Sequence, residues 1–221
     1  MKFSITSAAL LMLSAATLSA QKSDPDKLIA NGGVTVPGWT GRLDPRPESQ
    51  GRKITEAKFY PMGKGIHATA GPAAIYWNPA NMVTGNATVS ATFIQESASA
   101  HPEGYGLIVG GAQLTTPNQS YLYFLVRQDG KFLVNHRAND STVHKVVDWT
   151  ANSAVKAIDA SGKATNTLSI VADAKSVSFR VNGTEVHSIP RGGVEVGGIA
   201  GIRVNHNLDV HIDGFGVTRA K

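Results

Sequence analysis

The chain consists largely of short apolar runs separated by glycine, asparagine, aspartate and proline. Asn86–Gln95 alternates, with Val89, Ala91 and Phe93 on one side, as expected for a strand with one buried face. The same reasoning predicts strands at Tyr105–Val109, Tyr121–Arg127, Lys131–Arg137, Asn166–Ala172, Ser176–Val181, Thr184–Ile189, Gly198–Val204 and Leu208–Val217. The nearest candidate for a helix, Ala151–Ala160, is interpreted as a loop or one short turn. About ten to thirteen short strands at hairpin spacing predict an all-β, antiparallel two-sheet sandwich or jelly roll.

Two dipeptides predict tight hairpins. Asn182–Gly183 and Asp129–Gly130 each separate two strand-like runs, and both pairs tolerate the positive φ that short hairpin loops need. A two-residue loop at Asp129–Gly130 would place Tyr123 opposite His136. One face of that hairpin would then hold Tyr121, Tyr123, Leu125, Arg127, Phe132, Val134 and His136. A bulge in the loop would exchange the faces, so this assignment depends on the turn type.

Composition narrows the function classes. Of 221 residues 42% are apolar and 17% are charged, which is typical of a globular chain and excludes disorder. There is no cysteine, which excludes disulfides, thiolate metal sites and a cysteine nucleophile. The formal net charge is +5, but the basic residues are scattered. Because no basic stripe is present, no nucleic-acid partner is expected.

The first residues predict export. Lys2 precedes a short apolar stretch, and small residues Ser19 and Ala20 precede a polar segment, the pattern of a secretory signal over residues 1–20. The alternative, an uncut membrane anchor, is disfavoured because spanning a bilayer takes about 20 apolar residues. No later segment predicts a membrane span. We therefore expect a bacterial periplasmic or secreted protein, with an irregular lead-in over residues 21–53 and one jelly-roll domain over residues 54–221.

The C-terminal half carries a family resemblance. The run NTLSIVADAKSVSFRVNGTEVHSIP, followed by GGIAGIRVNHNLDVHIDGFGV, resembles the concanavalin A-like lectin/glucanase jelly roll, which includes LamG-like domains. The segments GKGIHATAGPAAIYWNP and YGLIVGGAQL are similar to a bacterial exported branch close to 3-keto-disaccharide hydrolases. The resemblance covers roughly residues 54–217 and implies the fold. It leaves the function open, because this fold includes lectins, glucanases and structural modules.

One departure from the family concerns catalysis. Family-16 glucanases carry Glu-x-Asp-x-Glu on one strand, which places three acids on one face, and this chain has no such triplet. The nearest arrangement is Asp209-x-His211-x-Asp213. It is interpreted as the solvent side of an outer strand, with a catalytic or metal cluster as the alternative. No catalytic residue and no metal ligand are assigned, and no cofactor is expected. A structural calcium ion would suit the fold, but no acidic loop has suitable spacing.

The predicted ligand is a carbohydrate. Sugar rings stack their C–H faces on aromatic rings, while their hydroxyls bind planar polar groups. The candidate ligand-binding residues are Tyr76, Trp77, Tyr105, Tyr121, Tyr123, Arg127 and His136. The alternative for each aromatic is packing in the core. His67 is a further candidate, for which a backbone-bonded histidine is the alternative.

Three functional hypotheses follow. The first is an exported jelly-roll module that binds carbohydrate without catalysis. The second is a hydrolase of modified sugars, resembling the 3-keto-disaccharide branch, with Asp209, His211, Glu96 or Glu103 among its acids. The third is a structural domain of the envelope, with flat polar sheet faces and no groove. The pattern determines neither the saccharide, nor the oligomeric state, nor the signal cleavage site.

Overall fold

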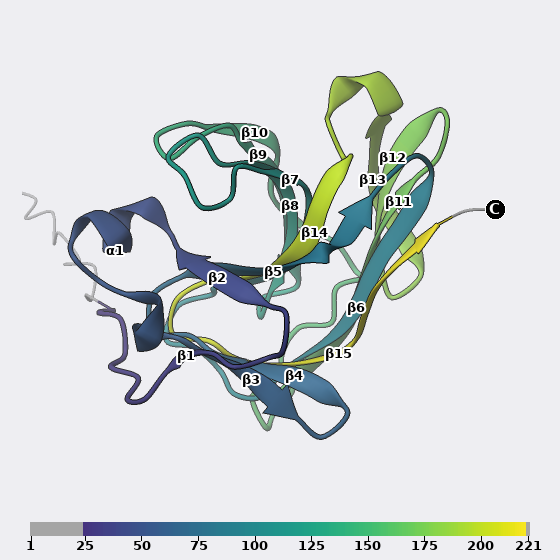
Figure 1. Cartoon of the computed structure of the whole chain (residues 1–221). Helices are drawn as coiled ribbons and strands as arrows, with labels where there is room; N and C mark the ends of the chain where they lie inside the picture. The colour runs from purple at the N-terminus through teal and green to yellow at the C-terminus, as the bar shows by residue number, and fades with distance from the viewer. Residues whose placement is uncertain (1–23, 220–221) are drawn as a thin grey trace, which may run out of the picture.

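The structure is a computed structural model that describes residues 24–219. The predicted signal segment lies outside these residues. Within them, fifteen strands form two packed sheets (Figure 1). The all-β, two-sheet jelly roll predicted from the sequence is confirmed. None of the helices in the described range is long and apolar enough to cross a membrane.

The first sheet has eight strands. In spatial order they are β1 (Gly33–Val34), β3 (Lys58–Met62), β4 (Gly65–Thr69), β15 (Asp209–Arg219), β6 (Ala87–Gln95), β11 (Ala164–Ala172), β12 (Ser176–Val181) and β13 (Thr184–Pro190). Neighbouring strands pair antiparallel, except that β1 runs parallel to β3. Alternation along β6 is strict, and its inward residues Val89, Ala91 and Phe93 are buried.

The second sheet has seven strands, all paired antiparallel. In spatial order they are β10 (Val143–Ala151), β9 (Lys131–Arg137), β8 (Ser120–Arg127), β7 (Gly104–Ala112), β14 (Gly198–Val204), β5 (Ala74–Val83) and β2 (Thr40–Leu43). Three short helices complete the described chain: α1 (Pro45–Ser49), η1 (Ile54–Glu56) and η2 (Arg191–Gly193).

Two hydrophobic clusters hold the sandwich together. The larger lies between the sheets and includes Phe59, Phe93, Phe124 and Phe179. The smaller lies on the opposite, outer face of the seven-stranded sheet. Its members are Ile75, Trp77, Ile108, Leu114, Tyr121, Tyr123, Leu125 and Leu133, with Trp149 and Ile199 packed against them. Strands β7 and β8 are therefore buried on both faces, which explains why their sequences are almost continuously apolar.

The segment before residue 54 is not irregular throughout, contrary to expectation. β1 pairs with β3 of one sheet, and β2 pairs with β5 of the other. Glycine and proline here shape turns between very short strands, such as Val36–Trp39, and not a loose surface segment. The boundary drawn at residue 54 stays a prediction, but the preceding residues contribute to both sheets.

Candidate functional site

The Asp129–Gly130 hairpin has a three-residue loop and not the predicted two-residue loop. The prediction that Tyr123 and His136 share one face of this hairpin is therefore wrong. Arg127 pairs with Lys131, and the Gly130 N–H donates to the Arg127 carbonyl at 3.1 Å. Gly130 has φ +78°, whereas Asp129 is not in the positive-φ region. This geometry is that of a turn closed by a left-handed glycine. One additional loop residue turns every side chain of β9 to the other face.

The corrected register separates His136 from the tyrosines. Tyr123 lies opposite Asn135 and Tyr121 lies opposite Arg137, while His136 lies opposite Leu122. The His136 ring contacts the Ser120 hydroxyl at 3.0 Å and is tilted by 38° to the His144 ring, whose centroid lies 5.7 Å away. Burial, and then the neighbouring His144, lower the pKa of His136. His136 therefore does not share a face with Tyr123, as the two-residue loop had predicted.

The other predicted aromatics are buried. Tyr76 and Tyr105 lie between the sheets with 0% of their surface exposed, and burial raises the pKa of Tyr105 to about 12. Trp77, Tyr121 and Tyr123 lie in the outer-face cluster with at most 7% exposed. In this conformation these rings offer almost no surface on which a sugar could stack. Their role as ligand contacts stays a prediction.

Arg127 is the predicted residue with the most accessible charge. Its guanidinium lies 4.5 Å from the centre of the Trp149 ring and forms two hydrogen bonds with Asp129, at 2.7 and 3.0 Å. These contacts fix Arg127 at the end of β8. The seven predicted ligand residues are thus distributed over the intersheet core, the outer-face cluster and the rim, and do not form one site.

A network of charged groups borders the outer-face cluster. Arg203 and Asp44 form two hydrogen bonds, both at 2.6 Å, and Arg203 also reaches the Tyr121 hydroxyl at 3.3 Å. Arg137 donates to the same hydroxyl at 3.0 Å. Burial alone would raise the pKa of Asp44, but the charge and hydrogen bonds of Arg203, together with the charges of Arg137 and Arg42, outweigh burial and lower it. Asp44 is therefore held as a carboxylate at the end of β2.

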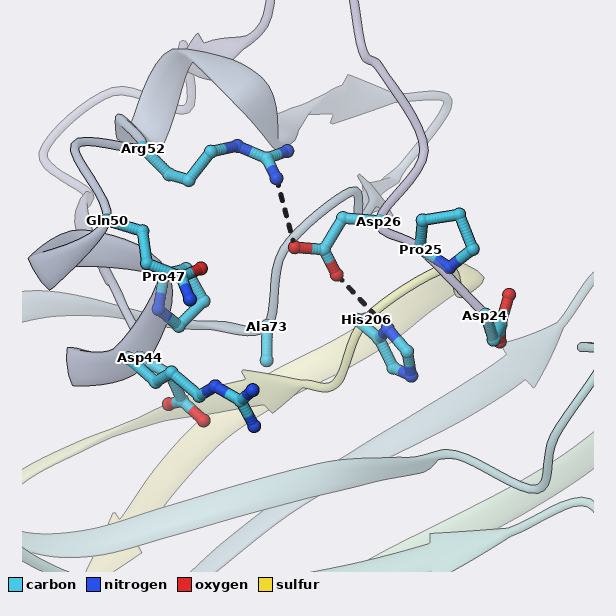
Figure 2. A pocket seen from close by; sticks show the side chains of 10 residues that line it. Asp24, Pro25, Asp26, Asp44, Pro47, Gln50, Arg52, Ala73 and His206 are labelled. Carbon is cyan, nitrogen blue, oxygen red and sulfur yellow. Dashed lines mark hydrogen bonds and ion pairs between the residues drawn. The ribbon is translucent and has the colours of Figure 1, made fainter. Parts of the chain in front are cut away.

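A cavity of about 510 Å³ lies beside these residues, next to α1; we call it the α1 pocket. Its walls are Asp24, Pro25, Asp26, Asp44, Arg46, Pro47, Gln50, Arg52, Ala73 and His206 (Figure 2). Most of these side chains are planar and polar, and the two prolines and Ala73 supply the apolar surface. The volume falls within the range of about 300–1,000 Å³ that is typical of small-molecule sites.

Helix α1 shapes one wall of this pocket. It begins in the sequence Asp-Pro-Arg-Pro, and proline in the first helical turn has the φ that a helix needs. Asp44 is the N-cap residue but makes no side-chain cap, because its carboxylate binds Arg203. Arg46 and Gln50 project from this short helix and are exposed. Within the described residues neither side chain has a hydrogen-bond partner, so both remain available to a ligand.

His206 forms the opposite wall. Its Nδ1 lies 3.1 Å from an Asp26 carboxylate oxygen, and its Nε2 lies 2.9 Å from Glu103. These two carboxylates outweigh partial burial and raise the pKa of His206 to about 9. Figure 2 shows Asp26 between His206 and Arg52, whose Nη1 lies 3.2 Å from the second Asp26 oxygen. His206 is therefore a cation at neutral pH and is held between two acids.

Asn207 holds the N-terminal segment against this wall. Its side-chain amide donates to the Asp24 carboxylate and to the Pro25 carbonyl, both at 3.0 Å. Its side-chain oxygen Oδ1 accepts from the Lys27 backbone N–H at 2.7 Å. Asn207 has φ +58°, a conformation that asparagine tolerates better than most residues. The turn at Asn205–Asn207 carries no local signal of a site, because the partners of its side chains lie far away along the chain.

The acids named for hydrolysis are dispersed. Asp209 is held by His67 at 2.6 Å on the outer face of the eight-stranded sheet, and its pKa is lowered chiefly by that contact. Glu96 binds Lys163 at 2.7 Å, and His211 binds Asp213 at 3.1 Å. Glu103 alone is connected to the α1 pocket, through His206. Among the described residues, no group of three or more His, Asp or Glu could hold a metal ion.

Comparison with known proteins identifies the fold. No family model and no curated protein sequence matches the chain. Among solved structures, the carbohydrate-binding module CBM66 from Bacillus subtilis is similar with a TM-score of 0.56 and 10% identity, over 87% of this chain and 99% of that one. The laminarinase catalytic domain from Thermotoga maritima has a TM-score of 0.56 and 10% identity, over 90% of this chain and 100% of that one.

A third similar structure is a protein of unknown function with a galectin-like fold from Bacillus subtilis. It has a TM-score of 0.56 and 14% identity, over 88% of this chain and 98% of that one. Identities this low establish architecture and not activity. Together with the two-sheet topology, they confirm that the chain folds as a concanavalin A-like jelly roll.

Proposed function

We propose that this protein is an exported carbohydrate-binding module and that its saccharide ligand binds in the α1 pocket. The observation that carries this proposal is the wall of planar polar groups around a cavity of about 510 Å³. Carboxylate, guanidinium and amide groups match the donor and acceptor pattern of sugar hydroxyls. Two structural neighbours are named as a carbohydrate-binding module and a laminarinase catalytic domain, which supports this ligand class.

The pocket is pre-organised, which favours binding of a polar ligand. Asp44 is fixed by Arg203, and Asp26 is fixed by Arg52 and His206. A ligand therefore meets oriented acceptors without the entropic cost of ordering them. Arg46 and Gln50 supply donors that have no partner of their own among the described residues. The mixture of acids and cations suits a neutral, hydroxyl-rich ligand better than a strongly charged one.

The alternative functions have less support. A glycosidase needs a carboxylic acid whose pKa is raised, so that it can protonate the leaving oxygen. In the α1 pocket, Asp44 is instead held as a carboxylate by Arg203, which lowers its pKa. A purely structural domain predicts flat faces without a groove, whereas the described residues enclose this cavity. Export to the periplasm or medium remains part of the proposal and comes from residues 1–20 alone.

Binding to a panel of glycans tests the proposal. The full chain is assayed by affinity gel electrophoresis and calorimetry against soluble β-glucans, xylan, mannan and fructans, with R46A and Q50A as pocket variants. Both residues are exposed on α1, so these changes leave the core intact. We expect at least one glycan to bind, and R46A to weaken it about tenfold, since a hydrogen bond to a charged group contributes about 1.5–3 kcal/mol.

The matched control is K145A, an exposed lysine on β10 that lies outside the α1 pocket. Its affinity should equal that of the wild type. Retention of no glycan by the wild-type protein would overturn the proposed function. Equal binding by wild type, R46A and Q50A would show that the ligand does not bind in the α1 pocket. Release of reducing sugar from a bound glycan would show that the protein is an enzyme and not only a binding module.

A further inference from the structure

A second cavity lies beside the edge strand β2 of the seven-stranded sheet, on the side of the eight-stranded sheet; we call it the Trp39 pocket. Its volume is about 270 Å³. It lies between β2 and β5 of the seven-stranded sheet and β4 and β15 of the eight-stranded sheet, which Figure 1 shows in separate layers. The residues around it are Trp39, Lys64, Gly65, Ile66, Asn78, Asn81, Ile212, Gly214 and Phe215. None of these residues lines the α1 pocket.

The aromatic wall of this pocket is rigid. The Trp39 N–H donates to the Val36 carbonyl at 3.1 Å, closing a turn in which Gly38 has φ +76°. The Trp39 ring packs against Phe59 and meets Phe215 edge-on, with centroid separations of 5.2 and 5.1 Å. Phe59 is fully buried, whereas Trp39 and Phe215 are only partly buried. The core therefore supports an aromatic surface that remains open to the solvent.

Irregular pairing in strands β5 and β15 positions the other walls of the Trp39 pocket. Between its pairings with Gly201 and Ile199 of β14, strand β5 advances from Trp77 to Met82. Strand β5 thus advances by five residues where β14 advances by two, and the excess residues of β5 bulge out from the sheet. Strand β15 has one excess residue between Asp213 and Gly216, and Phe215 lies in that irregularity. Bulges re-aim side chains and are over-represented next to functional sites.

Polar groups complete the pocket. The Asn78 carbonyl oxygen accepts from the Ala80 N–H at 2.9 Å, which fixes the amide group. In the part of the chain that the structure describes, the Asn78 NH₂ group and the whole Asn81 amide have no hydrogen-bond partner. Lys64, at the tip of the β3–β4 hairpin, is exposed beside them. An aromatic surface is thus combined with one oriented amide, a second amide without a partner among the described residues, and a cation.

We infer that the Trp39 pocket is a second carbohydrate site, in which one pyranose ring stacks on Trp39 and its hydroxyls bind Asn78 and Asn81. The choice of a carbohydrate as the ligand rests on the proposed function. The choice of the Trp39 pocket as the site rests on the residues that line it. Indole rings are favourable partners for the C–H face of a sugar, and amides supply both donors and acceptors. The cavity lies just below the usual size range of drug-sized sites, so it suits one ring and not a long chain.

Tryptophan fluorescence of the full chain tests this inference. The same glycan panel, together with its oligosaccharides of two to six units, is titrated against wild type, W39F, W39A and N81A. We expect a saturable fluorescence change that W39A abolishes. N81A, which removes no hydrogen bond within the described protein, should weaken the affinity about tenfold, as loss of a directly contacting group does. W39F retains an aromatic surface and should keep most of the binding measured by calorimetry.

Three variants separate this inference from the proposed function. If R46A weakens binding while N81A and W39A bind like wild type, the Trp39 pocket is not a carbohydrate site, although the α1 pocket stands. If N81A and W39A lose binding and R46A does not, the inference stands and the α1 pocket fails. If no glycan binds the wild-type protein, both fail. Near-ultraviolet circular dichroism of each variant identifies any that does not fold, and N81A then decides the result.

Discussion

The ion pairs that His206 forms with Glu103 and Asp26 should make the protein less stable as the pH becomes alkaline. The pKa of His206 rises from an ordinary 6.5 to about 9, because Glu103 and Asp26 bind its two ring nitrogens. A rise of this size corresponds to about 3 kcal/mol. The side chain is still 25% exposed, so solvent screening reduces the expected contribution to about 1–2 kcal/mol.

The direction of the pH effect follows from the raised pKa. The folded protein holds the proton of His206 more tightly than the unfolded chain does. The stabilisation is therefore complete below about pH 6.5 and is lost as the pH rises through about 9. Replacing His206 by glutamine removes the charge, and the variant should lack this part of the pH dependence. At pH 6 it should be less stable than wild type by about 1–2 kcal/mol.

Urea unfolding at several pH values between 6 and 10.5 measures this difference. Groups other than His206 that titrate in this range do so in both proteins, so the difference between the two curves reports His206. H187Q, at a partly exposed histidine on β13 outside these ion pairs, is the matched control and should show the pH dependence of the wild type. Parallel curves for wild type and H206Q would show that His206 is not held as a cation by its two acids, and the reasoning would be refuted.

Three further changes address the framework. R203M leaves the partly buried Asp44 without its partner and should cost about 2–4 kcal/mol in urea unfolding, with part recovered in the D44N/R203M double variant; additive losses would contradict the coupling. G106A places a Cβ 2.1 Å from the Phe124 carbonyl oxygen and should cost about 3 kcal/mol; an unchanged melting temperature would be the opposite result. N207G keeps the positive φ but removes three hydrogen bonds, and calorimetry should show weaker glycan binding together with about 2 kcal/mol less stability.

The sheets were predictable because their signal is local. Alternation along Asn86–Gln95 predicts which face of β6 is buried, and the buried positions of β6 match it. The Asn182–Gly183 hairpin also follows the prediction: Val181 pairs with Thr184, and both loop residues have positive φ. Local dihedral preference and period-two burial act within a few residues, so both can be read directly from a short sequence.

The Asp129–Gly130 hairpin shows where local reasoning becomes insufficient. The dipeptide favours a turn, but it does not fix whether Gln128 belongs to the strand or to the loop. The structure assigns Gln128 to the loop, where its side chain binds Ser99 and Gln95. Those contacts come from another part of the chain and are invisible to a two-residue motif. One position of register then decided which side chains share a face with Tyr123.

The α1 pocket was not predictable for the same reason. His206 meets Asp26 across 180 positions of sequence and Glu103 across 103. No spacing pattern relates residues that only the sandwich topology brings together. The turn at Asn205–Asn207 is explained locally by the tolerance of asparagine for positive φ, and that sufficient local explanation concealed the contacts made by its side chains.

The Trp39 pocket, by contrast, did leave a trace in the sequence. Its walls come from positions where alternation fails: Asn78–Asn81 interrupts β5 with Asn-Pro-Ala-Asn, and Phe215 stands between two glycines in β15. A regular strand buries one face and exposes the other, so it provides little space for a ligand. A bulge costs hydrogen bonds between neighbouring strands. Two bulges beside a partly exposed tryptophan therefore make this region a candidate functional site. The site that we propose at Trp39 thus lies where the period-two pattern is interrupted, whereas the aromatic residues predicted to contact the ligand from the regular strands are buried and belong to the core.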